Sequence, residues 1–170
     1  MTGFYKTYID IFETIDCCLK ENKVNPALIL LYSAIDSFSF LTDRENKKSK
    51  QAFLDWVTTW MINGHEIDCK AIDIYAARCG LLHRQTSESD LSLKNEAKEF
   101  YYVHGLKPIE PLQHALSNLE TTRDKVIPIR IEVLVSSFRQ GMADCMAEIR
   151  KDVDWDKSFR DRADKYFVTV

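Results

Sequence analysis

The sequence has few of the residues that interrupt regular structure. It contains five Gly and four Pro among 170 residues, too few for long loops or for a many-stranded β-sandwich. Cysteine is also sparse, and Cys17, Cys18, Cys69, Cys79 and Cys145 fit neither a disulfide framework nor a zinc site. We therefore expect free thiols in a reducing, cytoplasmic compartment, with Cys17 and Cys18 packed inside a helix bundle.

Membrane-length apolar runs and a strong excess of one charge are also lacking. The stretch Ala27 to Leu31 is far shorter than the ~20 residues of a membrane helix, and the N-terminus does not have the pattern of a secretory signal. Hydrophobic residues make up 45% of the chain and charged residues 29%, with a formal net charge of −3. This composition argues against disorder and against nucleic-acid binding by bulk charge, but it allows a local basic patch.

What the sequence does contain is apolar residues at three- and four-residue spacing, which predict a mainly α-helical protein. We expect helices over about residues 4–21, 26–41, 51–62, 68–82 and 132–150, with short helices around 112–119 and 154–166. The β-branched and aromatic segments 100–103 and 126–131 predict a small two-stranded β appendage, with Pro128 at an edge. The sequence has no internal repeat or linker, so we expect one domain over residues 1–170. Its bundle core would span about 4–84, and its β appendage and C-terminal helices about 98–167.

The second expected helix is apolar nearly all round, which is typical of the central helix of a bundle. We expect it to start at Pro26, with Asn25 as its cap. At 100° per residue, Ser33, Asp36 and Ser37 share one narrow polar stripe on it. A carboxylate buried at Asp36 would need a partner.

A basic segment follows that helix, with Arg44, Lys47, Lys48 and Lys50. It is interpreted either as a solvated loop or as a patch that contacts phosphate.

The fourth expected helix carries Arg78 and His83 near its end. A helical projection places both side chains toward packed surfaces. The expected exposed arc holds Lys70, Asp73, Ala77 and Gly80. On a regular helix Arg78 and His83 lie about 140° and roughly 7.5 Å apart. A last turn loosened at Gly80, the length of the arginine, or a second subunit would be needed to bring the two together.

Arg78 followed after four residues by His83, at the end of a bundle helix, resembles the signature of the HEPN superfamily. The strings Asp73–His83 and Tyr32–Asp36 are similar to uncharacterised bacterial members, and the resemblance covers about residues 5–105. It implies an up-down helical bundle, a homodimer and, in active members, a metal-independent endoribonuclease that acts as a toxin or in defence against phage. It further implies that Arg78 and His83 are the catalytic pair, with Asp36 as the acidic residue of an earlier helix.

These residue types suit RNA cleavage by attack of the 2′-hydroxyl on the neighbouring phosphate. An imidazole, with an ordinary pKa of about 6.5, exchanges protons at neutral pH, and a guanidinium stabilises the charge on phosphorus-bound oxygens. Asp36 would orient Arg78. Further substrate contacts are expected from Ser33, Cys79, Arg84, Lys47 and Lys48. We expect no metal and no cofactor.

Two other interpretations stay open at the level of sequence. Arg78 and Asp36 can form a purely structural ion pair, with His83 placed at the helix C-terminus by the helix dipole. The chain can also be a non-catalytic helical dimer that binds RNA, a nucleotide, a cognate antitoxin or a defence-system protein. Cys79 favours this second interpretation, because members of the family commonly have a polar residue after the Arg. His65, His104 and His114 rank lower as site residues.

Overall fold

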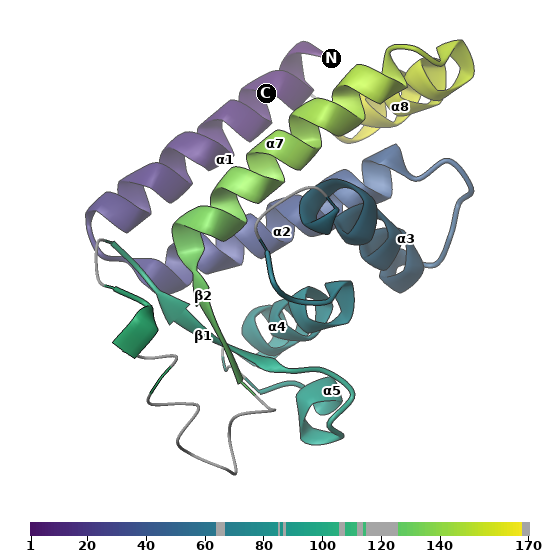
Figure 1. Ribbon diagram of the computed structural model, residues 1–170. Coiled ribbons are helices and arrows are strands. Elements are labelled where there is room, and N and C mark those ends of the chain that lie inside the picture. Colours follow the sequence, from purple (N-terminus) through teal and green to yellow (C-terminus); the bar gives the residue numbers. More distant parts are fainter. Residues whose placement is uncertain are drawn as a thin grey trace.

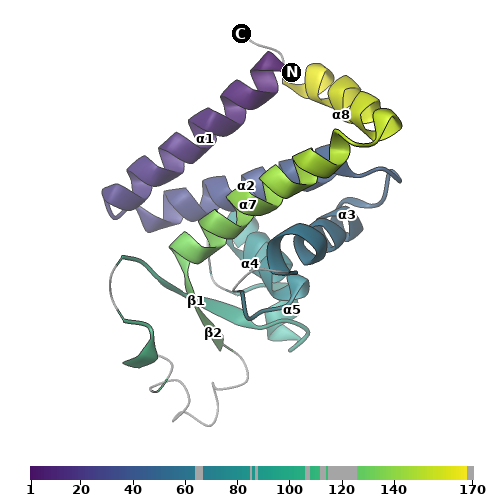
Figure 2. The ribbon, with the colours of Figure 1, turned by 45° about the horizontal axis from the view of Figure 1, so that its top comes forward.

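Helix α2 (Val24–Thr42) lies at the centre of the molecule. The computed structural model describes residues 1–63, 67–84, 86, 88–105, 108–111, 114 and 126–167, without the side chain of Arg84. Helix α1 lies on one side of α2, and α3, α4 and the two strands lie on the opposite side (Figures 1 and 2). The other elements are α1 (Thr2–Lys20), α3 (Ser49–Trp56), the π-helix η1 (Val57–Ile62), α4 (Ala71–Arg84), α5 (Asp90–Leu93), β1 (Glu99–Val103), β2 (Val126–Arg130), α7 (Ile131–Ile149) and α8 (Val153–Tyr166).

The expected mainly helical fold with a small two-stranded sheet is confirmed. Helix α2 packs against α1, α3, α4, α7 and α8, so it is the central helix that its all-round apolar pattern predicts. Its fully buried Phe38 contacts aromatic rings from four other helices. These rings are Phe4, Tyr8, Trp56, Phe138 and Phe159.

The same helix is long and apolar enough to cross a membrane by length and composition alone. Half of its most apolar 18-residue stretch is buried inside the protein. Core helices of globular proteins share this property, so its apolar character is accounted for by the packing of the bundle.

Two expectations about the N-terminal helices are wrong. Helix α2 begins two residues early, at Val24 with Lys23 as cap, because Pro26 is tolerated inside a first helical turn. Asn25 is therefore not the cap. Cys17 is exposed and Cys18 only half buried, because the buried stripe of α1 passes through Ile15 and Leu19 instead. All five thiols are free, as expected.

The third expected helix changes its winding midway, from α3 to the π-helix η1. The widened turn brings the Trp60 carbonyl against helix α7 at Gly141. A Cβ added to Gly141 would lie 2.2 Å from the Trp60 carbonyl oxygen. Only glycine permits this approach between the two helices.

The two strands pair in parallel, from Glu99 with Val126 to Val103 with Arg130. The helix expected around residues 112–119 lies, apart from residue 114, outside the described residues.

Of the arc that the projection predicts to be exposed, Lys70 is exposed, but Asp73, Ala77 and Gly80 on α4 are buried. Asp73 is 3% exposed and accepts hydrogen bonds from the backbone N–H groups of Lys70 and Lys98, at 2.9 and 2.7 Å. Gly80 is buried under the backbone at Thr86 and Glu88, whose carbonyl oxygens would lie 2.8 and 2.7 Å from an added Cβ. A projection of α4 alone cannot show that later segments pack on this face.

A polar cluster anchors the end of β1 to helices α1 and α7. His104 Nδ1 lies 2.7 Å from Glu132 Oε1 and its Nε2 lies 2.8 Å from the Leu19 carbonyl. The Gly105 N–H donates to the same Glu132 oxygen at 2.8 Å. Burial raises the pKa of the Glu132 carboxyl, but hydrogen bonds from backbone N–H groups and from His104 outweigh burial and hold this pKa below its ordinary value.

Glu132→Gln is therefore expected to lower the melting temperature at pH 7 but not at low pH. A carboxyl whose pKa is depressed in the folded state stabilises the fold above its ordinary value of 4.5, and that contribution is lost as the pH falls through the folded-state value. Thermal melting of both proteins between pH 3 and pH 7 measures the effect. The control is Glu148→Gln, on the same helix but paired with Lys151 at the surface. A difference between E132Q and the parent that does not change with pH would contradict the assignment.

Candidate active site at the end of helix α4

Arg78 joins the central helix α2 to the end of α4. Its Nη2 donates to Asp36 Oδ2 at 2.7 Å, and the two side chains are 17% and 32% exposed. Burial lowers the pKa of the guanidinium, but the hydrogen bonds and charges of Asp36 and Cys79 outweigh burial and raise this pKa. The partner that a carboxylate in an apolar helix requires is thus Arg78.

The same guanidinium also reaches His83. Arg78 Nη1 lies 3.2 Å from His83 Nε2. Because a guanidinium only donates, the imidazole accepts through Nε2, and the neutral ring then carries its proton on Nδ1. Nε2 can act as a general base once Arg78 Nη1 turns from it to a substrate phosphate, because this frees its lone pair.

Of the three ways in which Arg78 and His83 were expected to meet, the structure shows the second, the length of the arginine. Helix α4 stays regular through Arg84, so Gly80 does not loosen the last turn. The length of the arginine alone spans the separation, and the contact forms within one chain. His83 is exposed rather than packed on an apolar face, because it lies in the last turn of the helix. A half-buried guanidinium and an accessible imidazole therefore lie side by side at the surface.

Tyr75 and Cys79 complete the surroundings of Arg78. Its Nη1 lies 3.8 Å from Cys79 Sγ, and its Cζ lies 5.9 Å from the centre of the Tyr75 ring. Burial first, and then the neighbouring Cys79, raise the pKa of the Tyr75 phenol. The Nε of Arg78 is buried and has no hydrogen-bond partner among the described residues.

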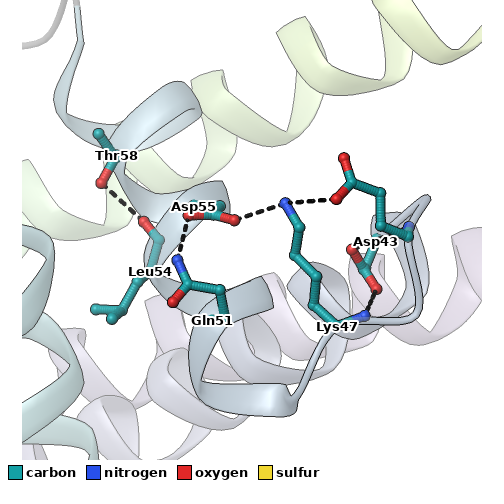
Figure 3. A network of polar contacts seen from close by, with 7 residues as sticks. Asp43, Lys47, Gln51, Leu54, Asp55 and Thr58 are labelled. Atoms are coloured by element: carbon teal, nitrogen blue, oxygen red, sulfur yellow. Dashed lines mark hydrogen bonds and ion pairs between the residues drawn. The ribbon is translucent and has the colours of Figure 1, made fainter.

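The basic segment does not form one patch that faces the site. Its side chains form ion pairs in different places. Lys47 pairs with Asp55 at 2.7 Å and with Glu45 at 3.5 Å, and its backbone N–H donates to Asp43 (Figure 3). The contacts of Lys47 are thus with its own loop and with α3, not with Arg78 or His83.

Two other members of the segment have different surroundings. Arg44 pairs with Asp152 and lies over the Trp155 ring. Lys48 is exposed at the start of α3. Only Lys50 comes near the site, with its Nζ 5.5 Å from the centre of the Tyr75 ring.

The remaining predicted residues have mixed outcomes. Ser33 is exposed on α2 and Asp36 lies one turn further along the same face. The side chain of Arg84 and the whole of His65 lie outside the described residues. His104 holds the structural cluster described above, and His114 is exposed. In the described part of the chain, no group of three His, Cys, Asp or Glu residues could hold a metal ion.

Tyr75 was not singled out from the sequence as a residue of the site, and Lys50 was named only as a member of the basic segment. A signal for Tyr75 exists, since Tyr75, Cys79 and His83 recur every four residues and so share one face of α4.

Comparisons with protein-family models, with curated proteins and with solved structures found no match for this chain.

Proposed function

We propose that this protein is a metal-independent endoribonuclease of the HEPN type, acting as a homodimer in the cytoplasm as a toxin or in phage defence. The observation that supports the proposal is the contact of Arg78 with both Asp36 and His83 at an exposed helix end. The HEPN up-down arrangement, the homodimer and the RNA substrate are parts of the proposal.

In this mechanism His83 Nε2 takes the proton of the RNA 2′-hydroxyl, and the 2′-oxygen attacks the adjacent phosphorus. The bond from phosphorus to the 5′-oxygen breaks, and the leaving 5′-oxygen takes the proton from the His83 imidazolium, which returns His83 to its neutral state. The products are a 2′,3′-cyclic phosphate and a 5′-hydroxyl. Arg78 donates to the oxygens that gain charge in the transition state. Asp36 holds the guanidinium in place, which makes it a positioning residue.

Purified protein is expected to cleave RNA in the presence of EDTA, and His83→Ala is expected to slow this cleavage at least about a hundredfold, because general acid–base catalysis supplies about 10²–10⁴-fold. Gel analysis of a labelled RNA measures the rate, and chemical mapping of the ends tests for the cyclic phosphate. His114→Ala, which removes an exposed imidazole elsewhere, is the matched control. Cleavage by His83→Ala at the parental rate, or intact RNA with the parent protein, would contradict the proposal.

A non-catalytic role in binding RNA, a nucleotide or a partner protein is the second candidate. The ion pair of Arg78 with Asp36 favours it, because this contact by itself joins α2 to α4 and needs no catalytic purpose. The same assay separates the two candidates. Protection of RNA without cleavage supports binding, whereas cleavage that persists with EDTA supports the enzyme.

A further inference from the structure

A cavity of about 290 Å³ opens beside His83, between the start of α3, helix α4 and the segment that leads into α5. The residues that line it are Lys50, Tyr75, Cys79, His83, Ser89, Asp90 and Leu91. The cavity is at the lower limit of ligand pockets, which run from about 300 to 1,000 Å³. It thus suits a single flat ring system better than a large ligand.

One wall of this cavity leads directly to the proposed catalytic pair. Tyr75, Cys79 and His83 are four residues apart, so they follow one another along one face of α4. Slightly more than two helical turns, about 12 Å along the axis, separate the Tyr75 and His83 positions. A chain molecule whose phosphate lies at Arg78 and His83 and whose backbone runs along this face of α4 therefore passes the mouth of this cavity.

The Tyr75 ring is both rigid and surrounded by cations. It packs edge-on against the buried Phe53, with ring centres 5.4 Å apart. The Lys50 ammonium lies 5.5 Å and the Arg78 guanidinium 5.9 Å from the ring centre. Lys50 is exposed and has a flexible side chain, so it can move from the ring to a neighbouring phosphate.

We propose that the cavity holds a nucleobase of the bound RNA, stacked on Tyr75, while Lys50 binds the phosphate attached to that nucleotide. Aromatic side chains beside a cationic groove are the usual means by which proteins hold single-stranded nucleic acid. The inference rests on the proposed ribonuclease function. It adds a specificity site, because a small pocket distinguishes bases by size while the catalytic pair does not.

The test is a series of replacements at Tyr75, assayed on short RNA oligonucleotides that differ in the bases beside the cleaved bond. Tyr75→Leu is expected to lower kcat/KM about tenfold, mainly through KM, because base stacking on an aromatic ring is lost. It is also expected to reduce the differences among the oligonucleotides. Tyr75→Phe keeps the ring and stays within about twofold of the parent by the same reasoning. Tyr101→Leu, an exposed tyrosine on β1, is the control without effect.

Lys50→Gln gives a second test that does not depend on the packing of Tyr75 against Phe53. An exposed lysine can be replaced without loss of the fold. If Lys50 binds one phosphate, the slope of log Kd against log salt concentration decreases by about 0.7. Fluorescence anisotropy measures Kd with oligonucleotides that carry 2′-deoxyribose and so cannot be cleaved.

The two assays distinguish failure of this inference from failure of the ribonuclease function. If the parent binds the uncleavable oligonucleotides through Tyr75 but cleaves no RNA, the base pocket stands and the ribonuclease function fails. If the parent cleaves RNA while folded Tyr75→Leu and Lys50→Gln keep the parental KM, Kd and salt slope, the base pocket is wrong. Absence of any oligonucleotide binding by the parent also overturns it.

Discussion

Arg78→Ala is expected to slow RNA cleavage about a thousandfold, the largest loss of activity for any single replacement in the site. The guanidinium donates to the oxygens on which charge develops, and removal of one such donor typically costs 10²–10³-fold. Arg78 also contacts His83 at 3.2 Å, so its loss leaves the imidazole without the group that orients it. Single-turnover cleavage of a labelled RNA measures the effect.

Arg78→Lys is the matched variant, because it keeps the charge but loses the planar fork. Arg78→Lys is expected to recover only part of the activity, because an ammonium group cannot reproduce the two-sided contact of the guanidinium with Asp36 and His83. Asp36→Asn keeps an oxygen acceptor beside Arg78 and removes the charge, so its loss of activity is expected to be smaller. More than a tenth of the parental rate in Arg78→Ala would exclude a catalytic role for this guanidinium.

Gly141→Ala is expected to destabilise the fold by about 3 kcal/mol, at the upper end of the usual cost of overpacking. Helix propensity alone predicts the opposite sign, because alanine favours a helix interior over glycine by about 1 kcal/mol. The added Cβ would lie 2.2 Å from the Trp60 carbonyl oxygen, a backbone atom that can move only if η1 and α7 separate. Urea denaturation followed by circular dichroism gives the free energy of unfolding.

Ala143→Gly is the control for this experiment. Ala143 is exposed on the same helix, so its replacement by glycine changes helix propensity but no buried contact. It is expected to lower the free energy of unfolding by about 1 kcal/mol. A Gly141→Ala protein as stable as the parent, or more stable, would show that α7 and η1 do not approach as closely as described.

Much of the helical architecture follows from local pattern. The stripes of α1 and α7 and the all-round apolar character of α2 predicted three long helices to within about two residues at most ends, because burial of an apolar face decides helix formation more than any single residue does. The exact start of α2 was missed because Pro26 fits several positions of a first turn.

The parts that were missed depend on contacts between distant segments. Asp73 is buried because the Lys98 N–H, 25 residues away, reaches its carboxylate. The short helix α5 lies in a polar stretch and is held by a capping box between Ser89 and Ser92, a signal too brief to outweigh the polar composition. The strand segments were found, but the parallel direction of their pairing depends on the connection between them.

The candidate site shows the same division between local and distant information. Arg78 and His83 were identified from their spacing and a family resemblance, and Asp36 from its position in an apolar helix. The contact between Arg78 and His83 was not predictable from helix geometry, because it depends on the conformation of one long side chain. The exposure of His83 and the separation of Lys47 from the site likewise depend on side-chain partners.

Asp36, Arg78 and His83 all belong to one polypeptide. Two copies would therefore bring together two complete sets of these groups rather than two halves. If one set cleaves an RNA strand by itself, the turnover per protein molecule would stay constant on dilution. If a strand must contact the sets of both copies, the turnover per molecule would fall in proportion to protein concentration.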